Sequence, residues 1–122
     1  ATNDLVRPAD LYGVSKVYLE GLASHYAFTT GLESIGLRIG DFKENDKPAL
    51  DAPEAMANYL SGRDMCHLID CCLTAQLKEP FLLANGISNN TFPRLDIDQA
   101  KVDIGYHPKD NGFNMYGYFK ND

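Results

Sequence analysis

Apolar residues recur at helical spacing near the start of the chain. On one face of a helix over residues 11–30 lie Leu11, Val14, Tyr18, Leu22 and Tyr26. Gly31 follows at once, and glycine readily adopts the left-handed conformation that ends many helices. The pattern therefore predicts one long helix that ends at residue 30.

The pattern then changes from helical spacing to alternation. Ile35, Leu37 and Ile39 occupy every second position within a predicted strand over residues 32–39. The polar stretch over residues 41–51 carries four acidic side chains and predicts a surface loop. A helix followed directly by a strand predicts α/β organisation.

More helix signals follow the loop. Pro53 suits the first turn of a short helix over residues 53–60. Ser61 and Asp64 have the spacing of a capping box, in which each side chain bonds the backbone N–H of the other residue. The helix that they open carries its apolar residues at core-facing spacing, namely Met65, Leu68, Ile69, Cys72 and Leu73.

The last part of the chain predicts a strand and a short helix. Residues 81–84 are fully apolar, which is typical of a strand buried in a parallel sheet. Asp96 is the predicted cap of a helix that ends at Gly105. Its predicted inner face consists of Ile97, Ala100, Lys101 and Ile104. The tail from Asn111 predicts loose order, and residues 1–122 are interpreted as a single α/β unit.

The composition is that of an ordinary water-soluble domain. The 122 residues carry 11 basic and 17 acidic side chains, for a formal net charge of −6, and no stretch concentrates Lys and Arg. Nucleic acid and anionic membranes are therefore not expected as partners. No apolar run could span a bilayer and the start of the chain shows no signal core, so a cytoplasmic location is predicted.

Metal and redox chemistry are not predicted. Cys66, Cys71 and Cys72 form no C-x-x-C pair, and we interpret them as buried structural thiols in a reducing compartment. The histidines are spaced irregularly for a metal site, at His25, His67 and His107.

Tyr12 and Lys16 carry the clearest candidate chemistry of the chain. Residues four apart on a helix share one face at about 5–6 Å. A fixed ammonium beside a phenol favours the phenolate form. Such a phenolate can accept a proton from a substrate hydroxyl while hydride leaves the same carbon.

The segment around this pair resembles a known family. Residues 12–16 (Y-G-V-S-K) are similar to the Y-x-x-x-K motif of the extended short-chain dehydrogenase/reductases, also called the NAD-dependent epimerase/dehydratase family. Residues 37–40 (L-R-I-G) and 61–64 (S-G-R-D) resemble two later landmarks of that family, in the family's order. G-I-S-N-N at 86–90 and I-G-Y-H-P-K-D at 104–110 resemble its uronate dehydrogenase-like branch.

The resemblance covers about residues 5–113 and implies the C-terminal half of a Rossmann-like, doubly wound NAD-binding fold. No G-x-G-x-x-G turn for a dinucleotide pyrophosphate occurs in the sequence. In the family, that turn and a hydroxyl residue that holds the substrate lie in the N-terminal half, which the resemblance implies is missing. We therefore expect the chain alone to be inactive and to bind NAD or NADP poorly.

The resemblance also implies roles for individual residues. Tyr12 is expected to be the general base and acid, and Lys16 to bind the nicotinamide ribose. The backbone at Ile39 and Gly40 is expected to pass beside the cofactor. The predicted cofactor contacts are therefore Tyr12, Lys16, Ile39 and Gly40. Arg38 is predicted to form a structural ion pair.

Asp41, Glu54 and Arg63 occupy candidate substrate positions. Asp41 stands where related enzymes carry a small polar residue, and Glu54 falls near an arginine that holds the substrate carboxylate in uronate dehydrogenases. Glutamate repels a carboxylate, which weakens the expectation that uronate is the substrate. For Arg63, solvation or an ion pair is the alternative role.

Three functions remain open. The first is part of an NAD-dependent sugar dehydrogenase whose intact relative oxidises a sugar hydroxyl with Tyr12 as base. The second is part of a sugar-nucleotide epimerase or dehydratase, in which Asp41 and Glu54 would be the extra carboxylates. The third is a non-catalytic, self-associating domain, because half of a doubly wound sheet exposes strand edges and apolar surface and thus favours a homo-oligomer.

Overall fold

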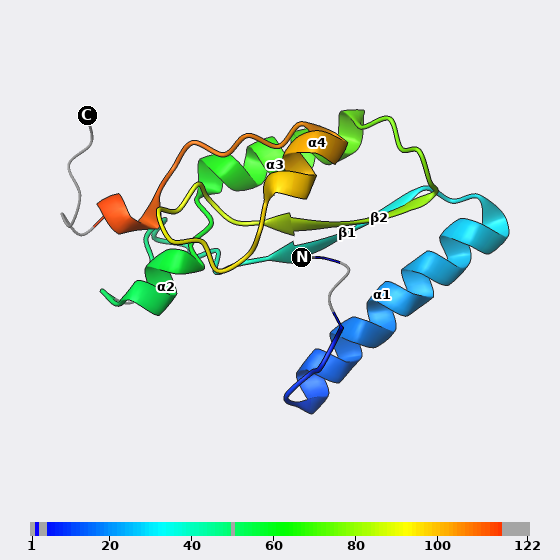
Figure 1. The fold of residues 1–122 in the computed structure, drawn as a ribbon, viewed down its shortest axis with the longest axis horizontal. Coiled ribbons are helices and arrows are strands. Elements are labelled where there is room, and N and C mark those ends of the chain that lie inside the picture. The colour runs from blue at the N-terminus through cyan, green and yellow to red at the C-terminus, as the bar shows by residue number, and fades with distance from the viewer. Residues whose placement is uncertain (1, 3–4, 50, 116–122) are drawn as a thin grey trace.

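The computed structural model describes residues 2, 5–49 and 51–115, in which helices alternate with two strands (Figure 1). The elements are α1 (Leu11–Thr30), β1 (Ser34–Ile39), α2 (Pro53–Ala57), α3 (Gly62–Thr74), β2 (Phe81–Gly86), α4 (Asp98–Ile104) and the 3-10 helix η1 (Gly112–Asn114). The predicted α/β class is therefore confirmed.

The two strands form a parallel pair in the described part of the chain. Their register runs from Ser34 opposite Phe81 to Ile39 opposite Gly86. Parallel neighbours need a long crossover connection, and here that connection contains α2 and α3. In Figure 1, α3 and α4 lie along one side of the strands, while α1 lies on the other side and runs diagonally away.

The main core lies between the sheet and the layer of α3 and α4. Its buried members are Leu68, Cys71, Ala84, Ala100, Ile104 and Tyr106. Ile35 and Leu37 pack against it, as the predicted alternation requires, but Ile39 is exposed and β1 begins at Ser34 rather than at residue 32. Each large apolar side chain buried in this way contributes roughly 1.5–3 kcal/mol.

The predicted bounds of α1 are confirmed, but the surroundings of its apolar stripe differ from those of a core helix. Asp10 caps the N-terminus by accepting a hydrogen bond from the Gly13 N–H, and Gly31 ends the helix at φ +74°. Of the residues in α1, all of which the structure describes, Ala27 alone is buried. The stripe from Leu11 to Tyr26 is exposed because two strands offer too little surface to cover a helix of 20 residues.

Other boundaries and faces need correction. The helix predicted over residues 53–60 ends at Ala57, because the chain then extends so that Tyr59 forms a β-bridge with Asp41. On α3, Ile69 and Leu73 are exposed, since the strands and the short α4 cover only one side of this helix. 

Three smaller predictions also change. Cys66 is exposed and only Cys71 of the three thiols is fully buried. Ile97, rather than Asp96, holds the N-cap position of α4, although the Asp96 carboxylate does accept a hydrogen bond from the Asp98 N–H. Phe113 is buried in η1 at the start of the predicted loose tail, and residues 116–122 lie outside the described part.

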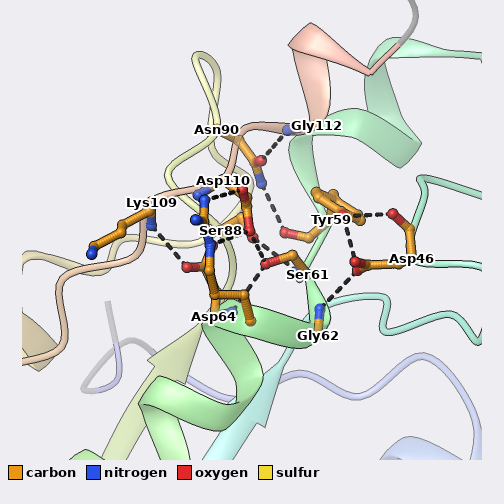
Figure 2. A network of polar contacts seen from close by, with 11 residues as sticks. Asp46, Tyr59, Ser61, Gly62, Asp64, Ser88, Asn90, Lys109, Asp110 and Gly112 are labelled. Atoms are coloured by element: carbon orange, nitrogen blue, oxygen red, sulfur yellow. Dashed lines mark hydrogen bonds and ion pairs between the residues drawn. The ribbon is translucent and has the colours of Figure 1, made fainter.

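The capping box at α3 is half formed, and its second half serves another purpose. Ser61 Oγ accepts a hydrogen bond from the Asp64 N–H at 3.0 Å, as predicted. The Asp64 carboxylate instead accepts hydrogen bonds from the backbone N–H groups of Lys109 at 2.8 Å and Asp110 at 3.0 Å (Figure 2). The C-terminal segment is thereby docked on the N-terminus of α3.

The side chain of Asp110 strengthens this docking. Its carboxylate accepts a hydrogen bond from Ser61 Oγ at 2.6 Å and a bidentate pair from the Arg63 guanidinium at 2.5 and 3.2 Å. Burial works to raise the pKa of Asp110, but the hydrogen bonds from Arg63 and Ser61 outweigh it and lower that pKa. 

Two side chains from the loop after β2 complete the network. Ser88 Oγ accepts a hydrogen bond from the Ser61 N–H at 2.9 Å. The Asn90 side chain donates to the Tyr59 carbonyl at 3.0 Å and accepts from the Gly112 N–H at 2.8 Å (Figure 2). The network therefore joins the segment before α3, the loop after β2 and the C-terminal segment.

The lowered pKa of Asp110 predicts an acid-sensitive contribution to stability. Because the folded-state pKa lies below the usual value near ~3.9, the contribution is full above that value and is lost as the pH falls through the folded-state pKa. We expect Asp110→Asn to reduce the urea midpoint at neutral pH and to flatten its decline on acidification. Asp98→Asn, at an exposed position of α4, is the matched control; equal acid slopes for wild type and Asp110→Asn would contradict the assignment.

Candidate functional site

Tyr12 and Lys16 lie one above the other on the first turns of α1. The Lys16 ammonium lies 5.0 Å from the centroid of the Tyr12 ring, within the range of a cation–π contact. Both side chains are exposed. The helical spacing that the sequence predicts thus brings the phenol and the ammonium together.

The pair lines a groove between α1 and β1. The groove has a volume of about 650 Å³ and is lined on the helix side by Tyr12, Lys16, Leu19, Glu20 and Ala23. All of β1, from Ser34 to Ile39, forms the other side. Three predicted cofactor contacts, Tyr12, Lys16 and Ile39, therefore meet in one place.

Gly40 follows Ile39 directly and holds a crowded backbone position. A Cβ at this residue would collide with the Asn58 carbonyl oxygen and would lie 2.7 Å from Ile87 Cγ2. The Gly40 N–H donates to the Gly86 carbonyl at 2.9 Å. Close packing against Asn58, at the end of α2, and against Ile87, after β2, explains the glycine, and its predicted contact with a cofactor stays a prediction.

An ion pair crosses the groove one helical turn beyond Lys16. Arg38 Nε donates to Glu20 Oε1 at 2.7 Å, and a terminal guanidinium nitrogen donates to Oε2 at 2.9 Å. The hydrogen bond from Arg38 to Glu20, together with their charges, raises the pKa of the guanidinium against the opposing effect of burial. The structural ion pair predicted for Arg38 is confirmed.

The predicted substrate residues lie outside this groove. Asp41 is held in the β-bridge, where its N–H donates to the Asn58 carbonyl at 2.7 Å. Glu54 is exposed in the first turn of α2, and Arg63 is paired with Asp110. The structure does not bring these three side chains together with Tyr12, and their contact with a substrate remains a prediction.

Two buried tyrosines differ from Tyr12 in their surroundings. Burial, followed by the charge of Asp46, raises the pKa of Tyr59 far above its ordinary value, and burial likewise raises the pKa of Tyr106. Tyr59 donates its hydroxyl proton to the Asp46 carbonyl, and Tyr106 donates to the Ile87 carbonyl at 2.7 Å. Both phenols are therefore hydrogen-bond donors that hold the fold.

Several residues of the network stand out in the sequence only as family landmarks. Ser88, Asn90 and Asp110 belong to the G-x-S-x-N and L-G-Y-x-P-x-D-like segments, and the structure shows that these segments bond to the start of α3 and to one another. Beyond that resemblance, no local pattern in the sequence indicates which partners these polar side chains bond. 

Neither a cluster of metal ligands nor a membrane-spanning helix is present in residues 2, 5–49 and 51–115. Within these ranges no three His, Cys, Asp or Glu side chains group as metal ligands. The helices of the same ranges are also too short or too polar to cross a membrane.

Comparisons with known proteins give two curated relatives from the archaeon Haloferax volcanii. An NAD-dependent glucose-6-phosphate dehydrogenase is 35% identical over 108 residues, which are 88% of this chain and 40% of the relative. An L-arabinose 1-dehydrogenase (NAD(P)(+)) is 36% identical over 116 residues, covering 89% of this chain and 46% of the relative. No protein-family model matches the sequence.

Solved structures show the same relationship. A glucuronic acid dehydrogenase from Chromohalobacter salexigens superposes with a TM-score of 0.78 at 33% identity, covering 90% of this chain and 39% of that one. A uronate dehydrogenase variant from Agrobacterium tumefaciens, complexed with NAD, gives a TM-score of 0.81 at 28% identity and covers 93% and 42% of the two chains.

These comparisons confirm the resemblance on which the sequence interpretation rests. The chain has the Rossmann-like architecture of the uronate dehydrogenases over the part that it shares with them. It spans about two fifths of the length of the relatives and structures that it matches. The homologues of this chain are thus NAD-dependent sugar dehydrogenases of the uronate dehydrogenase-like kind.

Proposed function

We propose that this chain supplies the proton-transfer element of an NAD-dependent dehydrogenase that acts on a sugar. The observation that carries the proposal is the contact between Lys16 and Tyr12 at the edge of a groove bounded by β1. Two relatives support it, because they are an NAD-dependent glucose-6-phosphate dehydrogenase and an L-arabinose 1-dehydrogenase that uses NAD(P)(+).

In the proposed reaction, Tyr12 acts on the substrate hydroxyl. The O–H bond breaks, its proton goes to the Tyr12 phenolate oxygen, and the electron pair left on the substrate oxygen forms a C=O double bond. At the same time the C–H bond of that carbon breaks, and its electron pair leaves with the hydrogen as hydride. NAD, when bound, is the hydride acceptor. The Lys16 ammonium, which lies over the Tyr12 ring, would donate hydrogen bonds to the nicotinamide ribose when NAD is bound.

The groove suits only one end of a dinucleotide. Its exposed ammonium and phenol can bond ribose hydroxyls, and the chain at Ile39 and Gly40 lies at the carboxyl end of β1, where parallel sheets bind ligands. The sequence offers no glycine-rich turn for the pyrophosphate. We therefore propose that this chain contacts the nicotinamide half of NAD and binds the whole cofactor weakly.

The sugar itself is proposed to lie near the same edge of the sheet. Asp41 follows Gly40 directly, and a carboxylate there accepts hydrogen bonds from neutral sugar hydroxyls while it repels a uronate. Glu54 and Arg63 remain candidate contacts. For Arg63, Asp110 takes two of the five guanidinium N–H groups, so a substrate would share the guanidinium with that carboxylate.

Titration of the 15N-labelled chain with NAD, followed by NMR, tests the proposal. We expect chemical-shift changes at millimolar NAD that cluster at Tyr12, Lys16, Ile39 and Gly40. Lys16→Met should abolish them because it removes the ribose donor. Lys78→Met, at an exposed lysine outside the groove, is the matched control and should bind like the wild type.

Two results would overturn the proposed cofactor contact. One is the absence of any chemical-shift change across the titration. The other is a set of changes that map elsewhere in the fold or persist in Lys16→Met.

Self-association is a second candidate function, favoured by the exposed stripe on α1. The stripe consists of Leu11, Val14, Tyr18, Leu22 and Tyr26. All five side chains are exposed, and none of them lines the groove. Apolar surface of this extent on one helix is typical of a helix that packs against another protein surface. A second copy of the chain would bury the stripe without blocking Tyr12.

Sedimentation velocity over a range of protein concentrations tests self-association. We expect the weight-average sedimentation coefficient to rise with concentration and Tyr18→Glu to suppress the rise, because a charge is costly to bury. Leu73→Glu places the same charge on an exposed position of α3 and should leave association intact. Monomeric wild-type protein at all concentrations would exclude this function.

A further inference from the structure

We propose that Arg38 is a positioning residue for Lys16. By engaging both carboxylate oxygens of Glu20, Arg38 prevents Glu20 from pairing with Lys16 and so keeps the Lys16 ammonium at Tyr12. The importance of this arrangement for catalysis rests on the proposed function, but the arrangement itself can be tested without NAD or sugar.

The competition arises from the sequence of α1. Lys16 and Glu20 are the only Lys, Arg, Asp or Glu residues between Leu11 and Thr30. They are four residues apart, so their side chains lie on the same face of the helix and their opposite charges attract. If Glu20 had no other partner, we would expect it to form an ion pair with Lys16.

Arg38 removes Glu20 from that competition. The two hydrogen bonds, at 2.7 and 2.9 Å, occupy one oxygen of Glu20 each. The side chains are 27% and 23% exposed, so water screens this pair less than it screens a pair on the open surface. A planar guanidinium that binds a carboxylate through two parallel bonds is favoured over a flexible ammonium.

The position of Lys16 fits this account. Its ammonium lies over the Tyr12 ring, and none of the ion pairs among the described residues joins it to Glu20. Tyr12, Lys16, Glu20 and Arg38 all line the same groove. Arg38 thus acts on the candidate proton-transfer pair through Glu20, because its hydrogen bonds go to Glu20 and to the Thr2 carbonyl and not to Tyr12 or Lys16.

A purely structural role for the ion pair makes a different prediction from a positioning role. Both Arg38→Met and the double variant Arg38→Met/Glu20→Gln lose the bond between α1 and β1. Only the single variant leaves an unpaired carboxylate one turn from Lys16. If positioning is the role, removal of that carboxylate in the double variant should restore the contact between Lys16 and Tyr12.

NMR of the Lys16 side chain measures this contact in the 122-residue chain. A methylene group held over an aromatic ring shows an upfield ring-current shift. We therefore expect the Lys16 Cε protons of the wild type to be shifted upfield. Tyr12→Leu should abolish this shift and thereby show that the Tyr12 ring causes it. Arg38→Met should move these protons to the value of a free lysine, and Arg38→Met/Glu20→Gln should return them upfield. Lys101→Met, which breaks the exposed pair with Asp98, is the matched control and should change nothing.

Each other outcome would overturn the proposal. An unshifted Lys16 in the wild type would mean that the contact is absent, and an unchanged shift in Arg38→Met would mean that Glu20 does not compete. Loss of the shift in both the single and the double variant would assign the ion pair a structural role alone. Failure of the proposed dehydrogenase function would instead appear in the NAD titration, with the ring-current pattern intact.

Discussion

The buried carboxylate of Asp64 is the constraint on which most of this structure depends. It is almost fully removed from water, and a charged group in that position is costly unless hydrogen bonds replace its hydration. The N–H groups of Lys109 and Asp110 supply those bonds, and the first turn of α3 adds the favourable end of its helix dipole. The C-terminal segment is therefore held across α3.

Much of the surrounding order follows from that placement. Docking of residues 109 and 110 brings the Asp110 carboxylate to Ser61 and Arg63, and the chain beyond it brings the Gly112 N–H to Asn90. Asn90 in turn holds the Tyr59 carbonyl, and Tyr59 bridges to Asp41 at the exit of β1. The loop that follows the candidate cofactor strand is thus anchored through a chain of hydrogen bonds.

The opposite side of the sheet is held by far fewer contacts. α1 buries Ala27 and is tied to β1 by the Arg38–Glu20 pair, while its apolar stripe faces outward. The candidate proton-transfer pair consequently lies where a well-packed body meets a sparsely attached helix. A pattern of apolar residues shows which side chains share a face, but it does not show what covers them. The stripe from Leu11 to Tyr26 therefore predicts the helix and leaves the burial of its face undecided.

Local geometry is what the sequence by itself determined about this protein. The bounds of α1 follow from Asp10 and Gly31, the alternation in β1 follows from Ile35 and Leu37, and the contact between Tyr12 and Lys16 follows from the pitch of a helix, because each depends on residues within one or two turns. Tertiary structure alone decided the partners of the charged side chains. Arg38 pairs with Glu20, 18 residues away in the sequence, and Arg63 pairs with Asp110, 47 residues away. Such partners are set by the folded backbone, which decides which charged side chains lie close together. Asp64 is a further example. Its spacing from Ser61 predicts a capping box, but its carboxylate accepts hydrogen bonds from the N–H groups of Lys109 and Asp110, which are far away in the sequence.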